Sequence, residues 1–483
     1  MARTLGSVVA ALATLAIGLV AILGTFAELS VFGSLADVSI YAVNLTIGLG
    51  LGLAVDYGLL MVARVREERA WRNDDDAVVR AAETAGRTIA FSAATVGVAL
   101  AALLVFPQYF LRSFAYAGIG VVVISAVTAV VLLPALLAVL GPRIDSWKVP
   151  GVRGIRGTES PLWRAVAQFV MRRSLVSALP VVTVLLVAAS PLLGVSFGTP
   201  DDRVLPTSAS SRQVGDALRN DFASADASPI VVVTTSAVDG ANLADYARTL
   251  SQEDGVQRVD SSAGTFVAGA PDGPGDPGRF SRPDAERLEV VSGLDPRSDE
   301  AQQLVTDLRA IAPPAGSTAL LGGETAVLVD SIDSIAEHLP LAAVWILLTT
   351  AILLFLFTGS VLQPLRALVM SALTLSATLG IMVFIFQDGH FADVLGFTPQ
   401  PLNTSMLVLL FCIAFGLSMD YEVFVLSRIK EAHDQGAGLE EAVAGGLARS
   451  GRIVSTAAAL IAVSFLAFVS SEVSFMQFFG LGT

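Results

Sequence analysis

The sequence is poor in the residue types on which metalloenzymes, P-loop ATPases and nucleic-acid-binding proteins depend. Its 483 residues include one cysteine, three histidines and two lysines, and only 15% of them are charged. The single cysteine, Cys412, allows neither an internal disulfide nor a thiolate metal site, and the histidines lie far apart in the sequence. There is no GxxxxGKS or GxxxxGKT motif and no basic cluster with interleaved aromatic residues. ATP hydrolysis, nucleic-acid binding and a bound metal or cofactor are therefore not expected.

Apolar residues, by contrast, are abundant. They make up 54% of the chain, and the mean hydropathy of +0.69 excludes an ordinary soluble globular protein. A helix needs about 20 mostly apolar residues to cross a bilayer, where backbone groups have no water to bond, so each such run predicts a helical span. Nine runs qualify, approximately 5–26, 41–63, 86–106, 112–140, 173–195, 339–358, 364–386, 404–427 and 452–470.

Basic residues indicate how these spans are oriented. The loops 64–87, 141–173 and 428–452 hold six, seven and four Lys or Arg, whereas the loops 27–40, 387–403 and 471–483 hold none, and among the short-loop residues only Arg112 lies on the wrong side. Loops rich in Lys and Arg stay in the cytoplasm, so the sequence predicts a multi-pass protein of the plasma (cell inner) membrane. The same orientation exports residues 197–338, which hold 23 acidic against 10 basic residues.

The exported segment has the pattern of a compact α+β domain. Short strand-like apolar runs alternate with helix-like runs, and a loop rich in glycine, proline and aspartate separates two halves. The order βαββαβ predicts a ferredoxin-like, porter-type domain. The expected strands are 229–235, 256–261, 287–292 and 317–321, the helices are 241–253 and 298–311, and the loop is 268–285.

The expected fold is a polytopic α-helical membrane protein with one extracytoplasmic α+β domain. In the cytoplasmic linker, Trp163 and Phe169 share an apolar face beside Arg164 and Arg172, which is typical of an amphipathic helix on the inner leaflet. A solvated linker is the alternative. The expected parts are transmembrane helices over 1–140, the linker over 141–171, a transmembrane helix over 172–196, the domain over 197–338 and transmembrane helices over 339–483.

Two segments 364 residues apart repeat each other. Residues 52–67 align without a gap to residues 416–431, and six of the sixteen positions are identical. Membrane transporters are commonly built from such repeats, with the working site where the halves meet. The matched polar positions are Asp56 with Asp420, Tyr57 with Tyr421, Arg64 with Arg428 and Glu67 with Glu431, and Gly86-Arg87 matches Gly451-Arg452 further on.

The two matched aspartates are costly to place in a membrane. A carboxylate in mid-bilayer costs roughly 2.5 to 3.5 kcal/mol on insertion scales, so two in corresponding positions indicate a function. Low dielectric and like-charge proximity favour proton uptake, which predicts that Asp56 and Asp420 exchange protons with the two sides of the membrane. The neighbouring Tyr57 and Tyr421 offer hydroxyls to the charged carboxylates. The alternative is that each aspartate only joins two helices by a hydrogen bond.

Small residues and a third carboxylate accompany these pairs. Gly48, Gly50, Gly52 and Gly416 let helix backbones approach closely, which we expect to bring the two Asp-Tyr pairs within bonding reach. Glu422 lies two residues beyond Asp420, on a different helix face. Both a relay role and a helix-interface role are open for it.

Residues 44–57 through Arg64, and residues 415–421 through Arg428, resemble the paired signatures of the MmpL transporters of the RND superfamily. The resemblance implies an exporter driven by the proton gradient that moves lipids or other hydrophobic molecules to the cell envelope. It also implies that each aspartate bonds the tyrosine of the opposite helix and that Ser92, early in the next span, supports this relay. Further marks are Asp202–Pro206, Gly389-His390, Gly396–Pro399 and Gly451-Arg452.

The resemblance also implies parts that this sequence does not show. Relatives have twelve spans and two periplasmic domains, whereas the nine runs found here correspond to spans three to eleven with the second domain. We therefore expect that this protein needs the missing spans, or a second chain, for activity. Membrane lipids, hydrophobic cargo and envelope accessory proteins are the expected partners, and protons are the coupling ion. The alternatives are an RND-related helper or lipid-sensing protein without export of its own, and an envelope enzyme, although residues 197–338 show no catalytic constellation.

Overall fold

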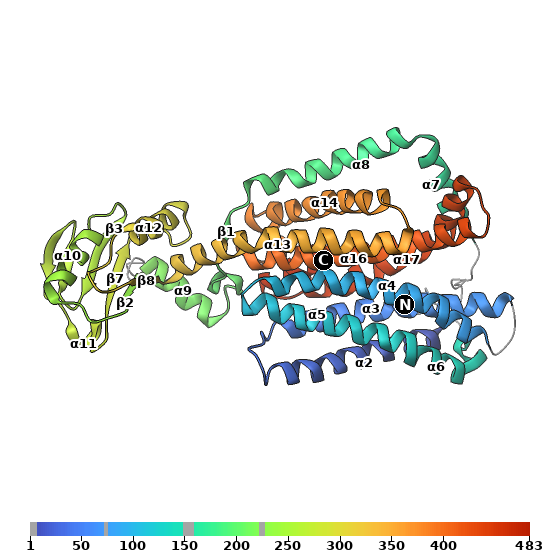
Figure 1. The fold of residues 1–483 in the computed structure, drawn as a ribbon, viewed down its shortest axis with the longest axis horizontal. Helices are drawn as coiled ribbons and strands as arrows, with labels where there is room; N and C mark the ends of the chain where they lie inside the picture. Colours follow the sequence, from blue (N-terminus) through green and yellow to red (C-terminus); the bar gives the residue numbers. More distant parts are fainter. Residues whose placement is uncertain (1–6, 72–75, 148–158, 222–227) are drawn as a thin grey trace.

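The computed structural model describes residues 7–71, 76–147, 159–221 and 228–483. A bundle of long helices carries a smaller α+β domain at one end, and we call this part, residues 197–338, the acidic domain (Figure 1). The described parts of the arginine-rich loops 64–87, 141–173 and 428–452 lie at the opposite end, which we call the basic end (Figure 1). Basic loops and acidic domain are thus on opposite sides, as the alternation of spans requires.

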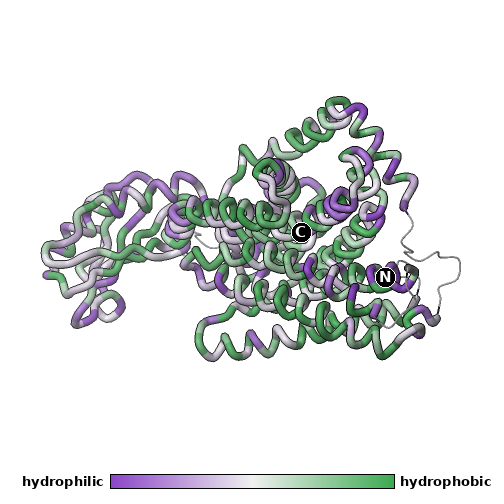
Figure 2. The backbone as a smooth tube through the Cα atoms, turned by 45° about the vertical axis from the view of Figure 1, so that its right-hand side comes forward, coloured by the Kyte–Doolittle hydropathy of each residue, from purple (hydrophilic) through white to green (hydrophobic). Residues whose placement is uncertain are grey.

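Within the described residues, nine helices are long and apolar enough to cross a membrane, which agrees with the nine runs in the sequence. Hydrophobic residues cover the bundle, and hydrophilic ones gather on the acidic domain and at the basic end (Figure 2). The bundle consists of α2 (Val8–Phe32), α3 (Ala42–Trp71), α4 (Ala77–Ala101) with η1 (Ala102–Val105), α5 (Tyr109–Val127), η2 (Thr128–Leu132), α6 (Leu133–Leu140), η3 (Gly141–Asp145), α8 (Ser174–Ala189), η4 (Ser190–Gly194), α13 (Glu324–Thr358), α14 (Leu362–Met382), η7 (Val383–Gln387), α15 (Ala392–Leu395), α16 (Thr404–Asp434), α17 (Leu439–Val469) and α18 (Ser474–Gly482).

The spans differ in detail from the sequence-based expectation, and α4 and α17, for example, begin at Ala77 and Leu439, well before residues 86 and 452. The helix expected over 339–358 begins much earlier, at Glu324, so α13 runs without interruption from the acidic domain into the bundle. The long fourth span contains a π-helical stretch, Thr128–Leu132, just before Pro134. Proline removes a backbone donor and its ring crowds the preceding turn, which is relieved by such a local widening of the helix.

The acidic domain has a mixed set of strands and helices around its own core. Antiparallel pairs place its sheet strands in the order β5-β4-β3-β7-β2-β8. Residues 268–285, expected as a loop, instead form β5, α11 and β6. The elements are β1 (Phe197–Gly198), η5 (Asp202–Val204), α9 (Ser210–Asp221), β2 (Ile230–Thr234), α10 (Gly240–Leu250), β3 (Val256–Ser261), β4 (Gly264–Val267), β5 (Ala270–Gly273), α11 (Pro277–Phe280), β6 (Ser281–Arg282), β7 (Ala285–Ser292), α12 (Asp299–Ala310) and β8 (Ala319–Gly322). β1 pairs with β9 (Leu402–Asn403), which directly precedes α16.

The linker contributes one amphipathic helix, α7 (Pro161–Arg172), at the basic end. A Cβ at Gly451 would lie 2.6 Å from the ring of Trp163, so this tryptophan packs directly on α17. Val166 and Phe169 remain exposed. That the exposed apolar face lies on the inner leaflet stays a prediction, and residues 148–158 of the linker lie outside the described residues.

Helix packing in the bundle interleaves the two repeats. α16 packs against α4, and α3 packs against α17, so each Asp-Tyr helix contacts the helix that follows the other one in sequence. The buried core is continuous across this arrangement and includes Leu53 of α3, Ile89 of α4, Leu409 of α16 and Ile461 of α17. The two segments with matching sequence are thereby brought together in the middle of the bundle.

Candidate functional site

A cavity lies where α3, α4, α16 and α17 meet, and both Asp-Tyr pairs line it. The helices contribute three residues each. In the alignment of the two repeats, each cavity-lining residue of α3 corresponds to one of α16, and each cavity-lining residue of α4 corresponds to one of α17. The six matched pairs are Asp56 with Asp420, Tyr57 with Tyr421, Leu60 with Phe424, Thr88 with Ile453, Ile89 with Val454 and Ser92 with Ala457.

Hydrogen bonds connect the two halves across this cavity. The Tyr421 hydroxyl donates to Asp56 Oδ2 at 2.6 Å. Ser92 Oγ donates to Asp420 Oδ1, and it also lies 3.1 Å from the Tyr57 hydroxyl. A serine hydroxyl carries one hydrogen, so while it donates to Asp420 it accepts from Tyr57.

The structure therefore places all five of these predicted residues together, with one difference in their connections. Asp56 and Tyr421 bond directly, as the resemblance implies. The link between Asp420 and Tyr57 passes through Ser92. A residue that the resemblance gave only as a support is thus part of the bonded chain itself.

Burial makes this cluster costly unless its polar atoms are paired. Tyr57 and Ser92 are each 2% exposed, and Asp420 is 7% exposed. Asp56 Oδ1 is buried and has no hydrogen-bond partner among the described residues. A buried polar atom without a partner costs about 1 to 3 kcal/mol, so its presence in a native site needs an explanation.

The position of the cluster along the helices follows from helical geometry. Arg64 lies eight residues after Asp56, which at 1.5 Å per residue is about 12 Å along the axis of α3. The repeat places Arg428 equally far from Asp420. At its other end α16 is capped by Asn403, whose side chain accepts from the Met406 N–H at 3.0 Å. The carboxyls thus lie inside the bundle, away from both helix ends.

The glycines do allow close packing, but toward other helices than expected. None of the four faces the opposite Asp-Tyr helix, so close contact between α3 and α16 does not explain how the pairs meet. The pairs come together because both helices pack on α4 and α17. A Cβ at Gly48 would lie 3.0 Å from Phe468, at Gly50 3.0 Å from Ile22 and Val121, at Gly52 3.3 Å from Ile461 and at Gly416 3.3 Å from Val96.

Glu422 forms an ion pair with Arg366 of α14. It does not belong to the residues that line the central cavity in the described chain. Arg366 also donates to the Gln363 side chain at 3.1 Å, so its guanidinium is held at the start of α14. This geometry favours the helix-interface interpretation of Glu422.

Sequence reasoning missed a second contact between the repeats, at the basic end. Arg64 of α3 pairs with Glu431 of α16 at 3.2 Å, and Arg428 of α16 pairs with Glu67 of α3 at 3.4 Å. We call these the crossed ion pairs. The signal was present, because all four residues are identical positions of the repeat. Only their exchange of partners required the structure.

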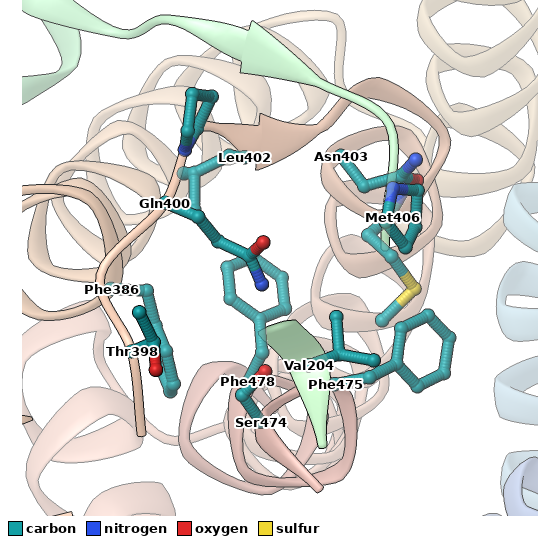
Figure 3. Close-up of a pocket in the computed structure, with 12 residues that line it drawn as sticks. Val204, Phe386, Thr398, Gln400, Leu402, Asn403, Met406, Ser474, Phe475 and Phe478 are labelled. Atoms are coloured by element: carbon teal, nitrogen blue, oxygen red, sulfur yellow. The ribbon is translucent and has the colours of Figure 1, made fainter. Parts of the chain in front are cut away.

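A second cavity lies at the other end of the bundle, next to the acidic domain. Its walls come from the segment after α14, the start of α16, α18, and Pro200 and Val204, just before and in η5. Figure 3 shows the Gln400 side chain reaching into it, with Phe386 on one side and Met406 and Phe475 on the other. The cavity is therefore mostly apolar with an amide in its interior.

Within the acidic domain, charged residues hold the two segments that lead from it into the bundle. Arg297, 8% exposed, pairs with Asp201, which lies between β1 and η5, at 2.5 Å and with Glu324 at the start of α13 at 3.1 Å. Burial disfavours the charged form of Asp201, but hydrogen bonds and the charge of Arg297 outweigh it and lower the pKa of Asp201. A hydrogen bond from Arg219 lowers the pKa of Asp202. The buried Arg297 guanidinium thus binds both segments that lead into the bundle, one through Asp201 and the other through Glu324.

A family model described as the MMPL family matches residues 1–177 and 203–482. The trehalose monomycolate exporter MmpL3 of Mycobacterium tuberculosis is 35% identical over 95% of this chain and 51% of its own length. A membrane protein of Streptomyces coelicolor is 40% identical over 97% of this chain and 63% of its own length. The mycolic acid-containing lipids exporter MmpL11 of Mycolicibacterium smegmatis is 28% identical over 96% of this chain and 48% of its own length.

A solved structure shares the fold. SecDF, a translocon-associated membrane protein from Thermus thermophilus, superposes with a TM-score of 0.53 at 16% sequence identity, covering 98% of this chain and 59% of that one. At this identity the likeness concerns the fold alone. The chain spans about half the length of the mycobacterial relatives that it matches.

Proposed function

Because this chain belongs to the MMPL family of membrane transporters, we propose that it exports lipids or other hydrophobic molecules across the inner membrane toward the cell envelope. The mycobacterial relatives named as exporters of trehalose monomycolate and of mycolic acid-containing lipids support lipid as the class of cargo. The cavity beside the acidic domain supports it too, because the apolar side chains of Phe386, Met406 and Phe475 form much of its wall and apolar walls suit a hydrophobic cargo.

The proton gradient is the proposed source of energy, with protons as the coupling ion and no further cofactor. Asp56, Tyr57, Ser92, Asp420 and Tyr421 form the proposed relay. The observation that carries this proposal is that two carboxyls from different halves share one buried, hydrogen-bonded cavity. One charge crossing 100 mV releases about 2.3 kcal/mol, a scale sufficient to shift the balance between two arrangements of the halves.

The acidic domain is the proposed porter domain on the cargo path. Its strands β8, β2, β7 and β3 lie side by side in that order, each antiparallel to its neighbours. Helices α10 and α12 follow β2 and β7 in sequence, which supports the ferredoxin-like arrangement. Since α13 is continuous from Glu324 into the bundle, movement of the helices is transmitted directly to this domain.

The proposed function is tested by envelope lipid analysis in a strain that lacks the gene. We expect one lipid class to be depleted from the envelope and to accumulate inside the cell, and the wild-type gene to restore it. Asp56→Asn and Asp420→Asn keep the shape of the side chain but remove the titrating group, so neither should restore export. Treating wild-type cells with a protonophore should produce the same defect.

Asp434→Asn is the matched control, because it makes the same substitution on α16 at an exposed position outside the cavity. It should restore export fully, with membrane levels equal for all variants. Full restoration by Asp56→Asn or Asp420→Asn would refute the relay. An unchanged lipid profile in the deletion strain would instead favour the helper or lipid-sensing alternative.

A further inference from the structure

The central cavity is symmetric in every acidic and hydroxyl-bearing position but two. Asp56 and Tyr57 match Asp420 and Tyr421, but Ser92 on α4 corresponds to Ala457 on α17. The other position is Thr88, whose counterpart is an isoleucine. Its hydroxyl bonds backward to the carbonyl of Thr84, outside the cluster. Ser92 and Ala457 are therefore the positions at which the two halves offer different hydrogen bonding to the carboxyls.

This difference has a visible consequence for the two aspartates. Ser92 is inserted between Tyr57 and Asp420 and bonds both. Ala457 has no hydroxyl, and on that side Tyr421 bonds Asp56 directly through Oδ2. Asp56 Oδ1, the oxygen left over, is the buried atom without a partner.

An unpartnered buried oxygen suits a protonated carboxyl better than a charged one. An ionised carboxylate can accept about four hydrogen bonds, and in apolar surroundings each unfilled position disfavours the charge. A proton bound to Oδ1 removes the charge and leaves Oδ2 to accept from Tyr421. Asp420 differs because the Ser92 hydroxyl, itself held by Tyr57, donates to it in a bonded chain.

Among the described residues, no cationic side chain lines the cavity that holds Asp56. From α16, Asp420 and Tyr421 face it, and Tyr57 lies beside it on α3, while α4 and α17 contribute only hydroxyl and apolar side chains to the cavity. α2 and α5, which pack on other faces of α3, line none of the cavity within the described chain. The arginines of the crossed ion pairs lie about 12 Å further along the helix.

We propose that Asp56 is the carboxyl that carries the transferred proton, and that Ala457 determines this by withholding the hydroxyl that Ser92 supplies to Asp420. A hydronium ion that reaches the cavity from one side gives its proton to Oδ1, which forms an O–H bond and leaves a water molecule. After the halves rearrange so that the site opens to the other side, this O–H bond breaks and the proton passes to a water molecule there, which regenerates the carboxylate. Ala457 is a positioning residue in this scheme. The inference rests on the proposed proton relay but does not depend on the cargo.

The test is site-resolved labelling of the full chain in lipid nanodiscs with dicyclohexylcarbodiimide, which reacts with protonated carboxyls in apolar surroundings. Peptide mass spectrometry measures labelling of Asp56 and Asp420 separately between pH 5 and pH 8. In the wild type we expect Asp56 to be labelled faster. Ala457→Ser adds a hydroxyl to the cavity wall at the position that corresponds to Ser92 and should lower the labelling rate of Asp56 about tenfold at neutral pH. Ser92→Ala should raise the labelling rate of Asp420.

The double substitution Ser92→Ala with Ala457→Ser exchanges the two environments and should reverse the preference. Reversal also excludes a trivial difference in reagent access, because access from either side is little altered by moving one oxygen atom. Equal labelling in the wild type, or a preference for Asp56 that survives the exchange, overturns the proposal. Since no cargo is needed, failure here is distinct from failure of export, which the lipid analysis measures.

Discussion

At the residue scale, the chain depends on a few positions where no side chain fits. Gly380 of α14 is such a position inside the bundle, because a Cβ there would lie 2.2 Å from the carbonyl oxygen of Ala188 and 2.8 Å from the Cα of Ala189. Both are backbone atoms of α8, which cannot move aside as a flexible side chain can. The outermost helix α8 is thus held against α14 by direct backbone contact.

We therefore predict that Gly380→Ala destabilises the protein by about 1 to 3 kcal/mol, because α8 must shift outward. Gly97→Ala on α4 is the matched control, since a Cβ at that glycine meets nothing within 4 Å. There the added methyl should be neutral or slightly stabilising, because alanine favours the helix. Thermal unfolding of both variants in detergent measures the difference. Equal melting temperatures would mean that the two helices separate without cost.

The cavity beside the acidic domain supports a second prediction at this scale. Met406 lines it, and its flexible side chain lies opposite Gln400 and beside Phe475 (Figure 3). Met406→Trp should fill much of the space and reduce lipid export strongly if cargo passes here, whereas Met406→Leu preserves volume and should leave export near the wild-type level. Envelope lipid analysis distinguishes them. Normal export by the tryptophan variant, at equal protein levels, would place the cargo path elsewhere.

At the element scale, the crossed ion pairs fasten α3 to α16 at the basic end. Each guanidinium contacts glutamates of both helices, as Arg64 does with Glu67 at 3.0 Å and Glu431 at 3.2 Å. Arg64 and Arg428 are 12% and 11% exposed at their side chains, so water screens these pairs less than ordinary surface pairs. Networks of this kind stabilise more than isolated surface pairs do.

A double-mutant cycle on Arg428 and Glu67 tests this connection. Each single reversal, Arg428→Glu or Glu67→Arg, places like charges together and should lower stability, and the double reversal should recover part of the loss. We expect a coupling energy of about 0.5 to 2 kcal/mol between the two residues. The same cycle on Arg66 and Asp145, whose aspartate is 52% exposed, should give a value near zero. Equal coupling in both cycles would remove any special role for the crossed pairs.

At the scale of the whole molecule, Arg297 connects the acidic domain to both chain segments that lead into the bundle. The pKa of Asp201 and of Asp202 is lowered in the folded protein. A carboxyl with a lowered folded pKa stabilises the fold at all pH values above its unfolded pKa, about 3.9 for aspartate, and this stabilisation is lost as the pH falls through the folded value. The junction should be intact at neutral pH and fail only in acid.

Hydrogen–deuterium exchange of the full chain measures this directly. Protection of the backbone around Asp202–Val204, corrected for the intrinsic pH dependence of exchange, should be constant from pH 8 to pH 5 and fall below about pH 4. Asp201→Asn removes the charge that Arg297 binds, so protection should already be low at pH 7. Glu300→Gln, an exposed carboxyl at the start of α12, is the control and should leave the profile unchanged. Retained protection in the Asp201 variant would contradict the junction's role.

The sequence by itself determined the membrane class, the nine spans, the family and the residues of the central cluster. The membrane class, the spans and the importance of the two aspartates follow from local physics, since a run of about 20 apolar residues can only cross the membrane or be buried, and an aspartate inside such a run is too costly to be incidental. The family and Ser92 came instead from the resemblance of the paired signatures. The repeat then matched Asp56 to Asp420. Matching the two aspartates through the repeat did not require knowing which side chains contact each other in the fold.

Only the tertiary structure decided which atoms meet. The glycines face α2, α4, α5 and α17 rather than the opposite Asp-Tyr helix, Ser92 stands between Tyr57 and Asp420, and Glu422 pairs with Arg366. A sequence repeat specifies which residues correspond, but a helix presents every face to some neighbour, and the neighbour is chosen by the packing of the whole bundle. The asymmetry between Ser92 and Ala457 gains its meaning there, because only in the folded cavity do these two positions face the same pair of carboxyls.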